Sequence, residues 1–371
     1  MKEKMTQIGQ EMKPELTAIS EFMYHNPELG NVEYKSSKAL VDFLKSHGFA
    51  VTQPVAGIET AFEAVFDSGN PGRKVAYLCE YDALPEVGHG CGHNMIGTMS
   101  AGAGVILSKV LEQGSIHVFG TPAEETDGAK VAMTNQGFFD DMDAAMMIHP
   151  ASETAESGST AAMEALQFDC LGKPSHAAGS PEKGINALNA VIHLFTGIDS
   201  LRQHVTDDVR LHGIITKGGV AANIVPEHAQ AQFYVRAATK EGVAEVKQKV
   251  LNIAKAAELM TGATLTVSNY EQTYDDLKTN QPLSEAFNQN LRNLGITDIK
   301  PAFFERGSTD IGNVSNVCPT IHPYISISDT PLIGHTHEMA NATITELAHE
   351  RLVIGAIALA HTGYDVVNNK L

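Results

Sequence analysis

The chain has 371 residues, of which 43% are hydrophobic and 19% charged, a composition typical of a globular protein and long for a single core. Its formal net charge of −18, from 26 basic and 44 acidic residues, argues against nucleic acid or an anionic membrane surface as the partner. We therefore expect two domains, and neither a nucleic acid nor a membrane as partner.

The N-terminal segment and the cysteines indicate the compartment. Residues 1–7 lead into a polar amphipathic stretch without an apolar signal segment. The apolar run at 352–360 is about half of the roughly 20 residues that span a bilayer. Four widely spaced cysteines suit reduced thiols better than a disulfide framework: Cys79, Cys91, Cys170 and Cys318. We expect a cytoplasmic protein.

The first part of the chain has the pattern of a sheet flanked by helices. Apolar periodicity predicts two helices within residues 1–50. Strands are predicted at 61–66, 74–80, 115–120 and 143–148, with a helix rich in small residues at 95–111. The same pattern resumes after residue 270 and ends in a long helix at 343–362.

A different pattern occupies the middle of the chain. Strands are predicted at 166–172, 210–217, 227–237 and 264–269, and helices at 184–204 and 240–260. The order β-α-β-β-α-β is that of a ferredoxin-like domain. We therefore predict a discontinuous α/β domain of residues 1–164 and 271–371, with a ferredoxin-like α+β domain of residues 165–270 inserted into it.

Five short segments outside the insert carry side chains that bind metal ions. They are residues 88–94, 123–125, 148–150, 307–310 and 334–337. Thiolate, imidazole and carboxylate are the donors that a zinc-like ion takes. Several of the segments follow strand-like runs, where an α/β sheet presents its functional groups. Together the segments predict a metallohydrolase centre.

Cys91 and His93 are two residues apart, so both can reach one ion, and Gly90 and Gly92 leave the backbone free to turn. Cys91 could instead be a small buried hydrophobic residue, or a nucleophile activated by His93 or His89. The nucleophile hypothesis leaves four other candidates without a role: Glu124, Glu125, His149 and His335. We therefore favour metal ligation.

Glu124 and Glu125 follow the strand predicted at 115–120. Adjacent carboxylates beyond a strand point in different directions, so one can bind metal while the other serves as base to a water molecule. The alternative is a solvated acidic turn. The neighbouring strand end and the other motifs favour a role in the centre.

Histidines supply the remaining candidates. His149 ends an apolar strand, and Pro150 is expected to stop that strand. A lone histidine in this position is more often a polar cap, and only the other motifs favour a ligand. His335 and His337 alternate on an extended loop, so we expect one of the two to reach the metal.

Motifs in the expected order across the whole chain resemble those of metallopeptidase family 20, which includes aminoacylases, glutamate carboxypeptidases and indole-acetyl-amino-acid hydrolases. The resemblance is narrower to the branch with aminobenzoyl-glutamate hydrolase and aminoacylase-1-like dipeptidases. The matching stretches are 25–30, 80–85, 88–94, 121–125, 172–178, 212–226, 307–315 and 334–339.

The resemblance implies a two-metal catalytic domain with an inserted ferredoxin-like lid that forms a homodimer. By motif position, Cys91 would bridge two divalent ions, zinc or manganese, and Glu124 would be general base and then acid. The other implied ligands are His93, Glu125, His149 and His335. Asp82 resembles an aspartate that orients a ligand imidazole, although a turn-capping aspartate is the equal alternative.

In the insert, His212 matches a family histidine that polarises the scissile carbonyl in the partner subunit's site; the alternative is an exposed histidine at a strand end. Asn223, Arg236 and Arg306 are candidates for binding a substrate carboxylate. His176 matches a recurrent family histidine and is grouped with them, without a derived role.

Two positions depart from the indole-conjugate branch. Asn94 stands where that branch has Asp, and His337 stands where it has Pro. The second departure leaves the last ligand open between His335 and His337. We choose His335 because it follows Gly334 as in the motif.

These observations predict a metal-dependent amidohydrolase that acts on N-acyl amino acids or small dipeptides with a free carboxylate. One rival is a metal-binding or oligomerisation protein without turnover, which would not need a second carboxylate beside the ligand. The other rival is a thiol-dependent hydrolase using Cys91, whose activity would survive a chelator.

Overall fold

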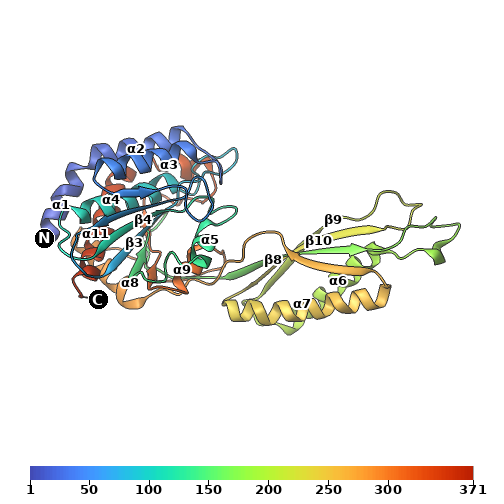
Figure 1. Cartoon of the computed structure of the whole chain (residues 1–371). Helices are drawn as coiled ribbons and strands as arrows, with labels where there is room; N and C mark the ends of the chain where they lie inside the picture. Colours follow the sequence, from blue (N-terminus) through green and yellow to red (C-terminus); the bar gives the residue numbers. More distant parts are fainter. Residues whose placement is uncertain (371) are drawn as a thin grey trace. The chain divides into compact units, whose positions relative to one another are not determined.

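The computed structural model describes residues 1–370, which form two compact units (Figure 1). Unit 1 consists of Met1–Ser159, Leu277–Glu305 and the chain from Thr309 onward. Unit 2 consists of Thr160–Asp276 and the short segment Arg306–Ser308.

Unit 1 is built on a six-stranded mixed sheet with the order β1-β2-β4-β3-β5-β13. The strands β3, β4, β5 and β13 run parallel as neighbours, whereas β1 and β2 pair antiparallel and β2 also pairs antiparallel with β4. The strand bounds are β1 Ala50–Thr52, β2 Phe62–Asp67, β3 Lys74–Cys79, β4 Ser115–Gly120, β5 Ala144–Met146 and β13 Thr320–Ile321.

Helices cover both faces of this sheet. Val75 and Tyr77 of β3 face one hydrophobic core, while Ala76 and Leu78 face another. Because alternate residues of a strand point to opposite faces, burial of both sets makes β3 an almost continuous apolar run. The helices are α1 Lys2–Glu11, α2 Lys13–His25, α3 Tyr34–Ser46, α4 His93–Ser108, α5 Ala129–Asn135, α8 Gln281–Asn293, α9 Ile311–Ser315, α10 His337–Ala342 and α11 Glu346–Val367.

The prediction of two helices in residues 1–50 was wrong, because this segment forms three. The first predicted helix is divided into α1 and α2 at Met12. Pro14 lies in the first turn of α2, where its missing N–H costs no hydrogen bond, and a continuous helix would have placed it in the interior.

The expectation that Pro150 stops its strand was also wrong. Pro150 lies inside β6 His149–Ala151, which pairs in parallel with β14 Tyr324–Ser326. This ladder has two strands, and proline is tolerated on an edge strand. A further two-stranded ladder joins β7 Ser159–Thr160, at the boundary of the units, to β12 Phe304–Glu305.

Unit 2 has the predicted ferredoxin-like fold. Its antiparallel sheet has the order β11-β8-β10-β9, and α6 and α7 pack against it. The bounds are β8 Ala162–Leu171, α6 Ala187–Leu201, β9 Arg210–Lys217, β10 His228–Ala237, α7 Lys240–Thr261 and β11 Thr264–Asn269. The helix α6 is shorter than predicted, because the 3₁₀ turns η1 Pro181–Lys183 and η2 Arg202–His204 flank it.

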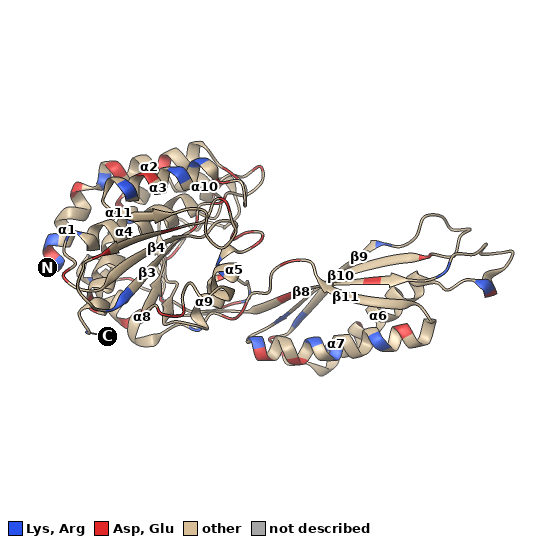
Figure 2. Ribbon diagram, in the orientation of Figure 1, with Lys and Arg blue, Asp and Glu red and all other residues tan. Residues whose placement is uncertain are grey.

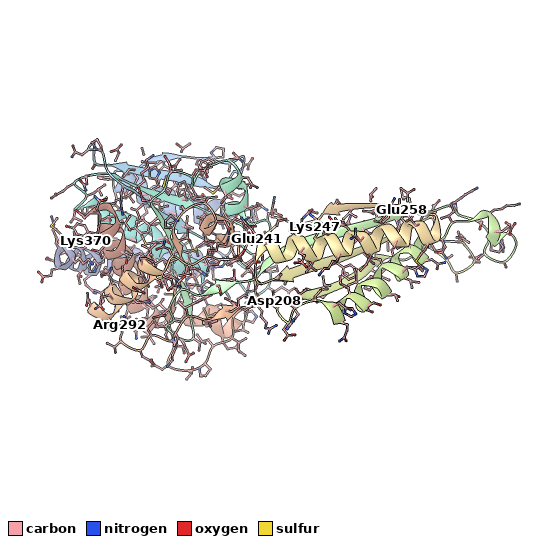
Figure 3. All side chains as sticks on the ribbon, turned by 90° about the horizontal axis from the view of Figure 1, so that it is seen from below. Asp208, Glu241, Lys247, Glu258, Arg292 and Lys370 are labelled. Atoms are coloured by element: carbon pink, nitrogen blue, oxygen red, sulfur yellow. The ribbon has the colours of Figure 1, made fainter. Side chains whose placement is uncertain are left out.

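Charged residues lie mainly on the outward surfaces of the helices. Figure 2 shows both acidic and basic residues on α2 and α3, and Figure 3 shows Glu241, Lys247 and Glu258 spaced along α7. Lys247 pairs with Glu164 of β8, at 2.5 Å between Nζ and Oε1. Within residues 1–370, no helix combines the length and apolar character needed to cross a membrane.

Candidate metal centre

Cys91 and His93 are presented by a turn that only glycine fits. His93 is the first residue of α4, and Gly92 before it has φ +78°. A Cβ at Gly92 would lie 2.4 Å from Cγ of Pro150, so the turn also packs tightly against β6. The left-handed conformation and this close approach together explain why the residue between the two donors has no side chain.

Donor atoms from four of the predicted segments converge in unit 1. Three of the four groups whose ligand atoms lie within 4.8 Å of one another join these segments: Cys91, His93 and His149; Cys91, Glu125 and His335; and His93, Glu124 and Glu125. Sγ of Cys91 lies 3.4 Å from Nε2 of His149, and Oε1 of Glu125 lies 3.1 Å from Nε2 of His335. Cys91 belongs to two of these groups. His337 begins α10 and belongs to none of those found among residues 1–370.

The far nitrogens of two imidazoles are held by hydrogen bonds. Nδ1 of His93 donates to Oδ1 and the backbone oxygen of Asp82, at 2.9 and 3.0 Å. Nδ1 of His149 donates to the backbone oxygen of Pro150 at 2.7 Å. Such bonds fix the tautomer, so Nε2 of each ring is left as the acceptor that a metal ion requires.

This donor set fits divalent metal ions. Nε2 of His93 and Oε1 of Glu125 are buried and make no hydrogen bond with residues 1–370. Buried polar atoms normally have partners, and a cation is the partner that an imidazole nitrogen and a carboxylate oxygen share. One thiol, three imidazoles and a carboxylate suit zinc or another borderline ion.

Glu124 is half-buried beside this group. Burial, with the nearby charges of Glu80 and Asp310, raises the pKa of Glu124 well above its usual value. A raised pKa suits a carboxylate that accepts a proton near neutral pH and later returns it.

A cavity of about 790 Å³ opens beside the donors. Cys91 and His149 line one part of it, and Tyr324 lies next to His149, with ring centroids 5.7 Å apart. Its other lining includes three carboxylates and one lysine: Glu153, Glu305, Asp329 and Lys300. The volume is that of a small-molecule site.

Comparison with known proteins decides the family. The chain is 34% identical to the Xaa-Arg dipeptidase of Mus musculus, over 99% of this chain and 89% of the relative. It is also 34% identical to one of the subunits of p-aminobenzoyl-glutamate hydrolase from Escherichia coli, over 76% of this chain and 63% of the relative. Residues 162–260 match the peptidase dimerisation domain. The chain belongs to the M20 peptidase family.

The fold of this M20 peptidase is also found among solved structures. The Bacillus subtilis YXEP protein, described as a dinuclear metal-binding peptidase of the M20 family, superposes with a TM-score of 0.72 at 17% identity. That superposition covers 97% of this chain and 99% of the other. The relatives act on amide or peptide bonds, so this M20 peptidase is a hydrolase of carbon–nitrogen bonds, as its sequence predicted.

The environment of Cys91 disfavours the thiol-nucleophile hypothesis. Burial raises the pKa of Cys91 to about 12, so the free thiol stays protonated at neutral pH. His89 makes a buried hydrogen bond to the backbone oxygen of Met23 at 3.1 Å, and burial lowers its pKa to about 4. A cation is what would convert Cys91 to a thiolate here.

The other predicted residues lie in unit 2. His212 pairs across the sheet with Tyr234, and the guanidinium of Arg236 lies 5.3 Å from the centre of the Tyr234 ring and donates to Oγ of Ser308. His176 forms a β-bridge with Ile224, beside Asn223. Arg306 lines a hollow of about 490 Å³ together with Arg202 and Arg210.

Three buried residues at the centre of unit 1 were not predicted: Glu80, Lys130 and His322. Glu80 was noted only as part of a motif, and nothing local distinguishes Lys130 from a solvated lysine. His322 is buried, its ring lies 5.6 Å from that of His149, and neither ring nitrogen has a hydrogen-bond partner within residues 1–370. Only the proline after it hinted at a strand end.

Proposed function

We propose that this M20 peptidase hydrolyses the amide bond of a small dipeptide or N-acyl amino acid, with Glu124 as general base. One observation carries the proposal. A half-buried carboxylate with a raised pKa stands within 4.8 Å of two candidate metal ligands, and Cys91 and His149 of the same centre line a cavity of small-molecule size. Hydrolysis needs this combination, whereas a protein that only binds metal does not.

Five residues would hold two divalent ions, zinc or manganese. Cys91, which would be the shared ligand by its position in the motif, belongs to two of the donor groups, as do His93 and Glu125. The others are His93, Glu125, His149 and His335. Divalent ions held there would polarise the scissile carbonyl and acidify a water molecule.

The protein's own groups would manage the protons. Glu124 takes a proton from the attacking water, whose oxygen bonds to the carbonyl carbon. It then gives that proton to the leaving nitrogen as the carbon–nitrogen bond breaks, so one carboxyl and one amine form. Asp82 holds the His93 ring in place. We assign His212, acting in the site of the other subunit of the dimer, to the developing oxyanion as an imidazole N–H donor. Burial, with Arg236 and Arg202 nearby, lowers the pKa of His212, which favours the neutral imidazole.

Unit 2 is proposed to bind the free carboxylate of the substrate and to form a homodimer. The match to the peptidase dimerisation domain supports dimerisation. Arg306, Arg236 and Asn223 are the proposed carboxylate-binding residues, with His176 beside Asn223. A guanidinium suits this task because it binds a carboxylate in a bidentate manner. The proposed location is the cytoplasm, because a thiolate ligand needs a reduced Cys91.

The cavity supports a substrate with a cationic side chain. Glu153, Glu305 and Asp329 line it, against one lysine, Lys300, whose Nζ lies 3.2 Å from Asp298. An excess of carboxylates attracts an ammonium or guanidinium group and repels an acidic one. The name of the mouse relative, Xaa-Arg dipeptidase, agrees with this substrate class.

The deciding experiment measures amino acid release from dipeptides and N-acyl amino acids that end in Arg, Lys, Leu or Glu. Each substrate is tested with added zinc or manganese and again with excess chelator. We expect chelator-sensitive release, fastest with Arg or Lys. Chelator-resistant release would instead support Cys91 as nucleophile, and no release from any substrate would support a protein that binds metal without turnover.

A further inference from the structure

Lys130 is a fully buried lysine that joins three segments of unit 1. It is the second residue of α5, and its Nζ lies 2.6 Å from Oε1 of Glu80 and 2.6 Å from Oδ1 of Asp310. Its backbone N–H donates to Oδ2 of Asp310 at 3.0 Å. Glu80 directly follows β3, and Asp310 directly precedes α9. The ammonium therefore ties the end of a central strand to the starts of two helices.

Such a group is costly to bury, so its position calls for an explanation. All three side chains are at most 2% exposed. A buried ion pair is rarely better for stability than apolar residues of the same size, because desolvation cancels most of the attraction. Stability alone is therefore a weak reason for this cluster.

The cluster reaches the proposed catalytic groups on its other side. Oε2 of Glu80 lies 3.4 Å from Nε2 of His93, the atom proposed to face a metal ion. Carboxylate oxygens of Glu80, Asp310 and Glu124 lie within 4.8 Å of one another. Two buried carboxylates and a half-buried one so close together repel one another. Lys130 donates hydrogen bonds to the two buried ones, Glu80 and Asp310.

We propose that Lys130 is a positioning residue for the hydrolysis: its ammonium anchors Glu80 and Asp310, and these carboxylates confine Glu124 and His93 to one working orientation. The inference rests on the proposed function, because Glu124 and His93 owe their roles to it. The side-chain hydrogen bonds of Lys130 run to Glu80 and Asp310. Its effect passes through the two carboxylates that it holds.

The test compares Lys130→Met, Asp310→Asn and the double variant Lys130→Met/Asp310→Asn with the wild type. We expect each single variant to lower kcat about 100-fold while KM stays within about threefold, the pattern of a group needed in the transition state. Because Lys130 and Asp310 act as one unit, the double variant should lose no more kcat than either single variant. It should nevertheless recover thermal stability relative to Lys130→Met, because one charge of each sign is removed.

Lys2→Met is the matched control. Lys2 is also a lysine of unit 1 that pairs with an aspartate, Asp365, and with an amide, Asn290 at 2.7 Å. We expect this variant to lower the melting temperature without changing kcat. If Lys130→Met does not fold, the test relies on the double variant, which loses one positive and one negative charge from the buried cluster.

A second readout does not depend on turnover. Each metal-free protein is loaded with cobalt(II) alone, and the visible absorption, which reports coordination geometry, is recorded. We expect the spectrum to change in Lys130→Met and not in Lys2→Met. Normal kcat in Lys130→Met, or kcat that recovers together with stability in the double variant, would overturn the proposal. A wild type without turnover would overturn the proposed function instead, and the cobalt spectra would still decide whether Lys130 orders the centre.

Discussion

Asp82 and His93 form a buried carboxylate–imidazole pair in which each carboxylate oxygen has its own task. Oδ1 accepts the Nδ1–H of His93 at 2.9 Å, and Oδ2 accepts the backbone N–H of Glu125 at 3.0 Å. One carboxylate thus orients the ring of one candidate ligand and the backbone of another. Burial opposes the charge on Asp82, but His93 and these hydrogen bonds outweigh it and lower the pKa of Asp82.

Asp82→Asn should therefore weaken metal binding. An asparagine cannot stabilise the imidazole as an anion does, and loss of such a partner typically costs about 10- to 100-fold in metal affinity. Titration of the metal-free variant with zinc, against a competing chelator, measures this change. Asp169→Asn is the matched control, because Asp169 pairs with His228 at 3.0 Å in unit 2. Equal affinities for wild type and Asp82→Asn would contradict the assignment.

The variants Glu124→Gln and Glu125→Gln should show which of the two carboxylates is the general base and which is a metal ligand. Removal of a general base lowers kcat by about 10²- to 10⁴-fold, so Glu124→Gln should be nearly inactive yet carry its full complement of metal. Glu125→Gln should lose metal, because an amide is a poorer donor than a carboxylate. Metal analysis of both proteins, alongside kcat, checks the pair. If Glu124→Gln lost its metal while Glu125→Gln kept it, Glu124 would be the ligand and Glu125 the base.

The features that the sequence predicts best are those determined by residues close together in the chain. Cys91 and His93 share one glycine-bounded turn, so their common direction follows from local spacing. The ferredoxin-like unit was predictable because alternation and helical periodicity are local patterns. The assignment of roles to the site residues stays a prediction.

Tertiary contacts are what the sequence could not reveal. Lys130 follows Asp127, Gly128 and Ala129, a context typical of a solvated turn, and its burial depends on carboxylates 50 and 180 positions away. His322 gives no local sign that its ring approaches His149. The break between α1 and α2 was missed because Pro14 falls within an otherwise helical pattern.

Gly92→Ala should destabilise unit 1 by about 2–5 kcal/mol. A residue with a Cβ pays about 1–2 kcal/mol in the left-handed region, and the contact with Pro150 adds about 1–3 kcal/mol of overpacking. Gly262→Ala is the control, because Gly262 has φ +74° with nothing within 4 Å of its Cβ position. Urea unfolding of the metal-free proteins measures both changes. Equal losses would show that the Pro150 contact relaxes freely.

Glu305→Gln should reduce the preference for a cationic substrate. Glu305 lines the cavity beside Tyr324, whose hydroxyl donates to Oε2 at 2.7 Å. Because Glu305 is exposed, its attraction for a guanidinium is worth at most about 1 kcal/mol, so KM for a dipeptide ending in Arg should rise up to about fivefold. KM for the analogue ending in Leu should not change, and parallel increases for both would argue against a charge effect.

The free energy of unfolding of unit 1 is expected to depend on pH through Glu33. Its side chain is inaccessible; Oε1 accepts the N–H of Ala123, the residue before Glu124, at 2.8 Å, and Oε2 accepts the hydroxyl of Thr60 at 3.0 Å. Burial, with a contribution from the charge of Asp82, raises the pKa of Glu33 from 4.5 to about 7. The folded state therefore holds this proton more tightly than the unfolded state does.

The sign of the effect follows from proton linkage. Between pH 4.5 and about 7 the unfolded chain has lost the Glu33 proton while the folded chain keeps it. The free energy of unfolding should fall as the pH rises through this window, by at most about 1.4 kcal/mol per pH unit, and level off above it. Urea unfolding of the metal-free proteins gives the free energy of unfolding at each pH. Subtracting the values for Glu33→Gln from those for the wild type isolates the contribution of Glu33. A difference that grows with pH would mean that Glu33 is ionised in the folded state, held by the donors from Ala123 and Thr60.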